Sequence, residues 1–246
     1  GSPGLDPSSP DKHIEAAGLT FLKTRVDITA ALGGDIMMGP VVYPYGAFVE
    51  GVWSDALQDD LSQHYANAAP VIEELGQHAQ KQDVKVAIEP ITHWETPGPN
   101  KLSQVIEFLG MVPSRAIGVV IDSAHETLDG DGPEEFARQV EWLAAEGRLH
   151  YAQASPPDRG DLSRSWLPWQ PVFGPLLAHY DGPVAIEIFN ALPQFAPALR
   201  LSRRKYWIPG VDAENARPSA YDVARSSLLK LREEFASLGV PTMPEE

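Results

Sequence analysis

Four side chains with oxygen donors follow one another along the chain at nearly constant spacing. They are separated by 33, 31 and 34 residues, and they are Glu89, Asp122, Gln153 and Glu187. About 30 residues is the length of one strand–helix unit, so successive parallel strands would each carry one donor to the same edge of a sheet. Three carboxylates that meet there repel one another unless a cation lies among them. An all-oxygen set suits Mg²⁺, Mn²⁺ or Co²⁺ better than zinc, and the spacing therefore predicts a divalent-metal site.

Any one of these residues taken alone has a simpler explanation. Acidic side chains at strand ends often cap the following helix or face solvent. Side chains alternate along a strand, however, and Glu89 shares its face with Ala87, as Asp122 does with Val120. Four donors in phase, on faces that are otherwise apolar, favour a shared site over four separate caps.

The elements that must position these donors alternate between short apolar runs and longer amphipathic segments. This pattern is typical of strand–helix units and a parallel sheet. Five strands are predicted clearly, at 35–39, 84–89, 117–122, 149–154 and 184–188, and a less regular sixth at 201–207. Helices are predicted at 11–32, 57–82, 101–111, 133–146, 169–180 and 216–238, with Asn100 and Pro133 as start signals.

The predicted fold class is α/β, a TIM (β/α)₈-type barrel formed by a single domain over residues 1–246. A complete barrel takes about 250 residues and eight strands. The sequence yields six strands and opens on a helix, so we expect the N-terminal strands of the barrel to be lacking. A fragment, an open barrel and completion by another chain are all consistent with that count.

The amino-acid composition disfavours several kinds of binding partner and site. The chain has 34 acidic and 19 basic residues and a formal charge of −15, which disfavours binding to nucleic acids or to anionic membranes. It has no cysteine, which excludes disulfides and thiolate metal ligands. We see no run of about 20 apolar residues and no signal-peptide pattern. A cytoplasmic enzyme is therefore expected.

Four motifs together resemble one known family. EPITHWET at 89–96, IDSAH at 121–125, ASPPDRG at 154–160 and AIEIF at 185–189 occur in its order and spacing. The chain thus resembles the xylose-isomerase-like sugar phosphate isomerases and epimerases, and within them the ketose 3-epimerases that act on D-tagatose and D-psicose. The resemblance implies a TIM barrel, a bound Mn²⁺ with Mg²⁺ or Co²⁺ as alternatives, and proton transfer next to a carbonyl through an enediolate.

The resemblance also implies roles for individual residues. Glu89 and Glu187 would be metal ligands and also the acid/base pair, with Asp122 and Gln153 completing the metal site. The substrate contacts that it implies are Glu95, His125, Arg159, Trp94 and Phe189. Four of these have an ordinary alternative: His125 as a helix cap, Arg159 as a solvated loop residue, and Trp94 and Phe189 as rings that only pack.

The chain departs from the family pattern in three ways, of which one is the lack of the N-terminal strands, which form part of the substrate pocket in relatives. Gln153 stands where most family epimerases carry a histidine, and an amide oxygen is a weaker donor than imidazole. His150 is not expected to replace it, since it lies three residues away and should point outward from the barrel. Thr92 and His93 stand where epimerases usually carry Asn-Arg. The sugar is therefore left open, with a neutral sugar or glycoside favoured by the −15 charge.

Three other functions stay open on the sequence. The same site could serve a metal-dependent lyase or dehydratase acting on a keto-sugar, in which proton abstraction alone suffices. The chain could instead be a non-catalytic barrel subunit that completes the site of a different partner chain. A nuclease is the least favoured because of the acidic charge. Relatives suggest that the chain forms a homo-oligomer.

Overall fold

The computed structural model describes residues 4–46, 54–190, 206–214 and 217–240. Their centre is a parallel sheet of five strands in the order of the chain, β1-β2-β3-β4-β5. The strands are β1 (Ile36–Gly39), β2 (Lys85–Ile88), β3 (Ile117–Asp122), β4 (Leu149–Ala154) and β5 (Val184–Ile186). Parallel neighbours joined in chain order are the arrangement of consecutive strands in a (β/α)₈ barrel, as predicted.

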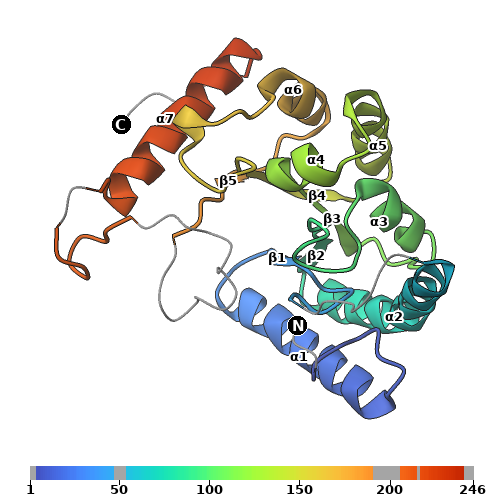
Figure 1. Cartoon of the computed structure of the whole chain (residues 1–246). Coiled ribbons are helices and arrows are strands. Elements are labelled where there is room, and N and C mark those ends of the chain that lie inside the picture. The colour runs from blue at the N-terminus through green and yellow to red at the C-terminus, as the bar shows by residue number, and fades with distance from the viewer. Residues whose placement is uncertain (1–3, 47–53, 191–205, 215–216, 241–246) are drawn as a thin grey trace.

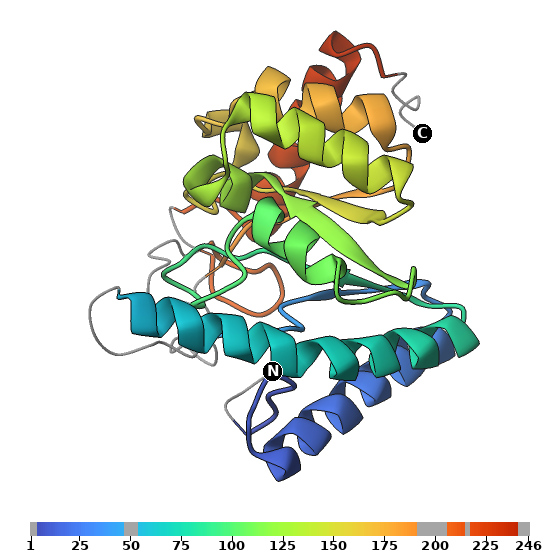
Figure 2. The same ribbon diagram turned by 90° about the vertical axis from the view of Figure 1, so that its right-hand side faces the viewer.

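Helices connect the strands and cover one face of the sheet. They are α1 (Lys12–Ala31), α2 (Asp55–Lys81), α3 (Leu102–Leu109), α4 (Ser123–Asp129), α5 (Pro133–Ala145), α6 (Trp169–His179) and α7 (Ala220–Ser237), with a short 3₁₀ helix, η1 (Leu162–Arg164). The longer helices follow one another in an arc around the strands (Figure 1). In the view turned by 90°, α1 lies beside α2, and α5 beside α6 (Figure 2).

The alternation of side chains along the strands separates the core from the other face. Val86, Ile88, Val119 and Ile121 are fully or almost fully buried and pack in the core beneath the helices. The residues between them point to the opposite face of the sheet. At the carboxyl ends of the strands this opposite face carries polar side chains, which is the place of active sites in barrels.

The five predicted strands are confirmed, with ends that differ by at most two residues. Of the sixth predicted strand, residues 201–205 lie outside the described part, and Trp207 forms an isolated bridge with Ser219. The predicted helices are confirmed, but the last begins later than expected, at Ala220, because Ser219 caps it. The α4 and η1 helices were not predicted.

Asn100 does not cap α3, contrary to the prediction. The N-cap is Lys101, and the side-chain amide of Asn100 donates instead to the carbonyl oxygens of Ile91 and Thr96, at 2.6 and 2.9 Å. Asn100 therefore fastens the loop that follows β2, where several predicted site residues lie.

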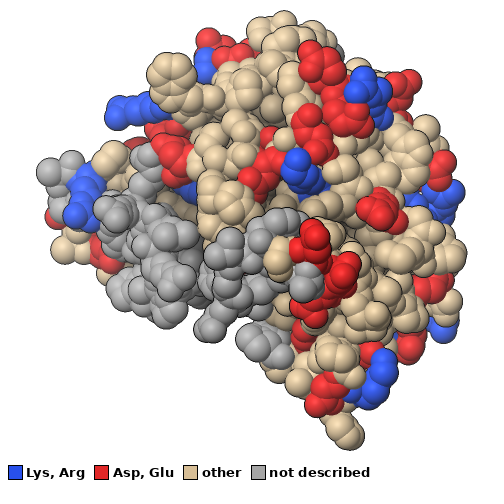
Figure 3. All heavy atoms as spheres, turned by 45° about the vertical axis from the view of Figure 1, so that its right-hand side comes forward, with Lys and Arg blue, Asp and Glu red and all other residues tan. Residues whose placement is uncertain are grey.

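The surface agrees with the acidic composition. On the face shown in Figure 3, acidic side chains are spread over the surface with basic ones between them. Among the described residues drawn there, no extended basic patch of the kind that binds nucleic acid is visible. In the described part of the chain, none of the helices has the length and apolar character needed to cross a bilayer.

Candidate active site

The four oxygen donors lie at the carboxyl ends of four neighbouring strands. Glu89 directly follows β2, and its backbone N–H donates to Gly39 at 3.0 Å. Asp122 ends β3 and is in register with Gln153 on β4. Glu187 directly follows β5, and its backbone N–H donates to the carbonyl oxygen of Ala154, the last residue of β4, at 3.0 Å. The structure thus brings the predicted donors to one edge of the sheet.

Glu89, Asp122 and His125 form the tightest part of this group. One potential ligand atom from each lies within 4.8 Å of the other two, close enough to hold a metal ion. His125 Nε2 is 3.6 Å from Glu89 Oε1 and 3.7 Å from Asp122 Oδ2. The side chain of Asp122 is fully buried and that of Glu89 is 11% exposed. Buried carboxylates this close together require positive charge nearby.

Arg159 supplies part of that charge and joins Asp122 to Glu187. Its Nη1 donates to Asp122 Oδ2 at 2.6 Å, to Glu187 Oε2 at 2.8 Å and to Ser155 Oγ at 2.6 Å. Burial and then the charge of Asp122 raise the pKa of Glu187, while Arg159 acts in the opposite direction. Arg159 itself has a positive φ of 55°, a backbone conformation that residues other than glycine seldom adopt.

Gln153 provides the observation that tests a metal against this donor set. Gln153 is 5% exposed, and its side-chain oxygen Oε1 is buried and has no hydrogen-bond partner in the part of the chain that the structure describes. A buried acceptor without a donor costs about 1–3 kcal/mol. A cation held by Gln153, Glu89, Asp122 and Glu187 would satisfy this oxygen and offset the repulsion of the carboxylates. The residues present therefore fit a divalent metal.

His125 is engaged at both ring nitrogens. The backbone N–H of Thr92 donates to Nδ1 at 3.0 Å, and Nη2 of Arg159 lies 2.7 Å from Nε2. A neutral imidazole accepts a hydrogen bond at only one nitrogen, so the bond that is kept decides the tautomer. Both of these neighbours are N–H donors, so a neutral His125 can accept from only one of them. Its Nε2 also lies within 3.7 Å of carboxylate oxygens of Glu89 and Asp122, where it could contact a metal ion or a ligand.

Two loops bring the other predicted residues to the rim. Tyr45, in the loop after β1, donates to Glu95 Oε2 at 2.8 Å. Trp94 is 42% exposed and packs edge-on against His93, whose ring nitrogen Nδ1 lies 2.8 Å from a carboxylate oxygen of Asp129. The rim therefore presents an exposed indole beside a fixed carboxylate.

Phe189 packs against Arg159. The guanidinium carbon of Arg159 lies 4.9 Å from the centre of the Phe189 ring, and the N–H of Phe189 donates to the carbonyl of Arg159 at 2.8 Å. Phe189 thus helps to hold the arginine side chain in place.

Sequence reasoning missed a pair of serines that fastens the site. Ser123 Oγ donates to the carbonyl of Ser155 at 2.7 Å, and the N–H of Ser155 donates back to Ser123 Oγ at 2.8 Å. Both residues are fully buried, and Ser155 also accepts from Arg159. Each serine stands just beyond the end of a strand, but this position alone does not distinguish it from an ordinary loop serine.

The prediction that His150 points outward from the barrel is wrong. The register of β3 and β4 shifts between Val119, which pairs with Leu149, and Val120, which pairs with Tyr151. The extra residue is His150, and its ring occupies the space where a Gly118 side chain would project. Gly118 alternates onto the same face as Asp122, so the bulge turns His150 to the inner face.

His150 nevertheless does not join the candidate site. It lies beside Gly118 near the start of β3, and Lys85, which begins β2, is close enough to affect its charge state. Burial lowers the pKa of His150 to about 4, and the nearby backbone of Arg115 and Ala116 acts weakly in the opposite direction. It is a buried neutral histidine at the opposite end of the strands.

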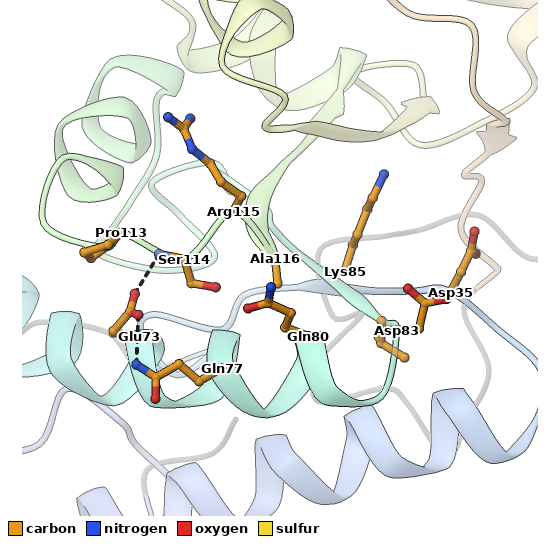
Figure 4. Close-up of a pocket in the computed structure, with 11 residues that line it drawn as sticks. Asp35, Glu73, Gln77, Gln80, Asp83, Lys85, Pro113, Ser114, Arg115 and Ala116 are labelled. Atoms are coloured by element: carbon orange, nitrogen blue, oxygen red, sulfur yellow. Dashed lines mark hydrogen bonds between the residues drawn. The ribbon is translucent and has the colours of Figure 1, made fainter.

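A cavity of about 610 Å³ also lies at that opposite end (Figure 4). Its walls come from the second half of α2, the start of β2 and the turn before β3. Glu73 on this wall accepts from the backbone N–H of Ser114 at 2.8 Å and from the amide of Gln77 at 3.1 Å. None of the predicted site residues lines the cavity, so the donor cluster and not the cavity defines the candidate site.

Comparison with known proteins agrees with this geometry. A family model described as a xylose isomerase-like TIM barrel matches residues 1–208. The chain belongs to this family. One similar solved structure is that of a candidate sugar phosphate isomerase/epimerase from Anabaena variabilis. Its sequence is 57% identical to this chain and the TM-score is 0.93, over 97% of this chain and 74% of that one.

Two further relatives carry names of activities. The L-ribulose 3-epimerase of Methylomonas sp. (strain DH-1) is 26% identical over 191 residues, which are 77% of this chain and 62% of that protein. The solved structure of a D-allulose 3-epimerase from Methylomonas sp. has a TM-score of 0.78 at 22% identity, over 95% of this chain and 74% of that one, which shows a shared fold. The chain spans about three fifths of the length of the curated relatives that it matches, 62% and 61%.

Proposed function

We propose that the chain is a sugar epimerase or isomerase that transfers a proton at the carbon next to a keto group, with the help of a divalent metal. The observation that carries this proposal is the largely buried group of oxygen donors at the ends of four neighbouring strands, including Oε1 of Gln153, which has no hydrogen-bond partner among the described residues. The names of the relatives, which are ketose 3-epimerases, support it. The charge of −15 favours a neutral sugar over an anionic one.

The metal would be held by Glu89, Asp122, Gln153 and Glu187. Oxygen donors suit Mg²⁺, Mn²⁺ or Co²⁺. Of these ions, we propose Mn²⁺ first because the family resemblance implies it. When bound, the ion would polarise the keto group and so lower the pKa of the neighbouring C–H.

Glu89 and Glu187 are proposed as the acid/base pair. They follow β2 and β5, with β3 and β4 between them, so their carboxylates approach the mouth from two sides. One carboxylate would take the proton from the carbon next to the keto group. The other would return a proton to the opposite face of the planar intermediate, which inverts the configuration at that carbon.

Arg159 and His125 are proposed to hold the sugar oxygen on which negative charge develops. Both residues are at least nine-tenths buried, and Arg159 donates N–H groups to the carboxylates of Asp122 and Glu187. Arg159 is already fixed by Asp122, Glu187 and Ser155, so it would need little reorganisation when the charge appears. A fixed donor in a site with little water stabilises charge more than a mobile one does.

The test compares the wild-type chain with Glu187→Gln, Asp122→Asn and a matched control, Glu141→Gln on the exposed face of α5. Metal content and Mn²⁺ affinity are measured first, followed by deuterium incorporation from D₂O into a panel of ketoses. We expect one metal per chain and deuterium at the carbon next to the keto group in wild type and Glu141→Gln. Both site variants should lose exchange and bind metal more weakly.

Two results would count against the proposal. Loss of water or of a glycosidic group after proton abstraction, without return of a proton, would instead indicate a lyase. No metal binding and no exchange with any ketose, with both restored by a second chain, would indicate a subunit that completes a partner's site.

A further inference from the structure

Arg159 directly contacts two of the four proposed metal ligands. Its Nη1 donates to Asp122 Oδ2 at 2.6 Å and to Glu187 Oε2 at 2.8 Å. Its Nη2 lies 2.7 Å from Nε2 of His125, and this ring nitrogen is itself 3.7 Å from Asp122 Oδ2. The guanidinium group is therefore a cation placed against the same oxygen donors that are proposed to hold the metal.

The nitrogen Nη1 of Arg159 has more acceptors than hydrogen atoms. Besides the two carboxylates it contacts Ser155 Oγ at 2.6 Å, so three acceptors share its two N–H groups. The other oxygen of Asp122, Oδ1, accepts from the backbone N–H of Ala124 at 2.6 Å. Both oxygens of this aspartate are thus engaged by donors, and a metal ion must compete with Arg159 for Oδ2.

Burial makes this competition strong. The side chain of Asp122 is fully buried and that of Arg159 is 9% exposed, so solvent and salt screen their charges little. Arginine keeps its positive charge throughout the pH range of proteins. The guanidinium group therefore stabilises the carboxylates and, for the same reason, opposes the entry of a divalent ion.

Ser155 gives the arginine a contact that does not depend on the carboxylates. Its hydroxyl donates to the backbone carbonyl of Glu187 at 2.8 Å, and its lone pairs accept from Arg159. The backbone of Arg159 is also fixed, because its N–H donates to the carbonyl of Pro156 and its carbonyl accepts from the N–H of Phe189, both at 2.8 Å. Arg159 can thus give up a carboxylate oxygen and still stay in the site.

We propose that Arg159 is an internal cation that competes with the divalent metal for Asp122 and Glu187 and so lowers the affinity of the site for the metal. Ser155 retains the guanidinium group when an ion takes the carboxylate oxygens, and the N–H groups released from them become available to a ligand oxygen. This inference rests on the metal-binding part of the proposed function and not on its reaction.

The experiment measures Mn²⁺ affinity by calorimetry on the full chain after treatment with a chelator. Wild type is compared with Arg159→Leu, Arg159→Gln and a matched control, Arg164→Leu, which removes a positive charge from an exposed position on η1 in the same loop. We expect both Arg159 variants to bind Mn²⁺ at least about tenfold more tightly than wild type, because a buried positive charge beside the ion is removed. Arg164→Leu should stay within about twofold of wild type.

Ser155→Ala tests the part played by the hydroxyl group. Without this acceptor, both N–H groups of Nη1 turn to the carboxylates, so Mn²⁺ affinity should fall about three- to tenfold. The matched control is Ser123→Ala, which removes an equally buried hydroxyl group and leaves the acceptor of Arg159 in place; its affinity should stay within about twofold. In the Arg159→Leu background, Ser155→Ala should have little further effect, because it acts through the arginine.

General damage to the site would weaken metal binding, so tighter binding by the Arg159 variants is a specific outcome. Equal or weaker Mn²⁺ binding by these variants would overturn the proposal. If neither variant folds, Ser155→Ala and Ser123→Ala decide: weaker binding by the first alone would support the proposal, and equal effects would overturn it.

Failure of the proposed reaction is recognised separately. A wild type that binds Mn²⁺ but exchanges no ketose would refute the reaction, and the affinities of the variants would still decide the role of Arg159. Mn²⁺ binding by the Arg159 variants but not by wild type would support the competition. No binding by wild type or by either variant would overturn it.

Discussion

Replacing Glu126 by glutamine tests whether this carboxyl group, on the helix that follows Asp122, is uncharged in the folded protein. Glu126 lies on α4, and both of its carboxyl oxygens are buried without a hydrogen-bond partner among the described residues. Burial raises its pKa from 4.5 to about 8, and the charges of Asp131 and Asp122 add to the effect, with Lys101 opposing them. The folded protein therefore holds this group protonated near neutral pH.

The sign of the effect on stability follows from proton binding. Between pH 4.5 and about 8 the folded state keeps a proton on Glu126 that the unfolded state releases, so the free energy of unfolding falls as the pH rises through this range. At 1.36 kcal/mol per pKa unit, the loss due to Glu126 is about 3 kcal/mol by pH 7 and about 5 kcal/mol by pH 8. Glutamine has nearly the same shape and does not ionise, so Glu126→Gln should lack this loss.

The assay is urea unfolding at pH 5 and at pH 8 of wild type, Glu126→Gln and the exposed control Glu141→Gln, all in the presence of a chelator. The free energy of unfolding of Glu126→Gln relative to wild type should increase by several kcal/mol from pH 5 to pH 8. Glu141→Gln should follow wild type at both pH values. Parallel behaviour of wild type and Glu126→Gln would refute the conclusion that Glu126 is buried and neutral.

Three further outcomes are expected. Arg159→Leu should lower the free energy of unfolding of the metal-free protein by about 3–5 kcal/mol, because Asp122 and Glu187 lose the cation that they share. Chemical denaturation measures this loss, and added Mn²⁺ should restore part of it. His150 has a pKa lowered from 6.5 to about 4, so the folded state binds fewer protons than the unfolded state between these values. Wild type should therefore lose about 3 kcal/mol as the pH falls through this range, and His150→Leu should lack that loss in acid unfolding curves. Gln153→Leu should weaken Mn²⁺ binding at least tenfold in calorimetry while far-ultraviolet circular dichroism stays unchanged, because the variant removes one neutral ligand from a folded scaffold.

The sequence alone was sufficient to predict the strands and the edge at which their donors meet. Glu89, Asp122 and Glu187 could be placed because the carboxyl ends of parallel strands meet at one edge and strand–helix units have a nearly constant length. The same reasoning did not find α4, because seven residues starting directly at a strand end are too few to show a helical period.

The alternation of side chains along a strand did not predict side-chain direction correctly where the pairing of two strands is irregular. The outward direction predicted for His150 assumed an unbroken two-residue period along β4. The register shift against β3 inserts one residue, and the ring turns inward over Gly118. A bulge depends on how two strands fit together, so the sequence of one strand does not reveal it.

The residues that hold the site together are also set by the tertiary structure. The pairing of Arg159 with Asp122 and Glu187 joins positions 37 and 28 residues apart, and the bond from Tyr45 to Glu95 spans 50 residues. The sequence by itself determined which side chains could reach the carboxyl edge, since that depends on periodicity along the chain. Which of them touch, and which oxygen is left without a partner, is decided only in three dimensions, where loops from separate strands meet and burial removes the water that would otherwise satisfy them.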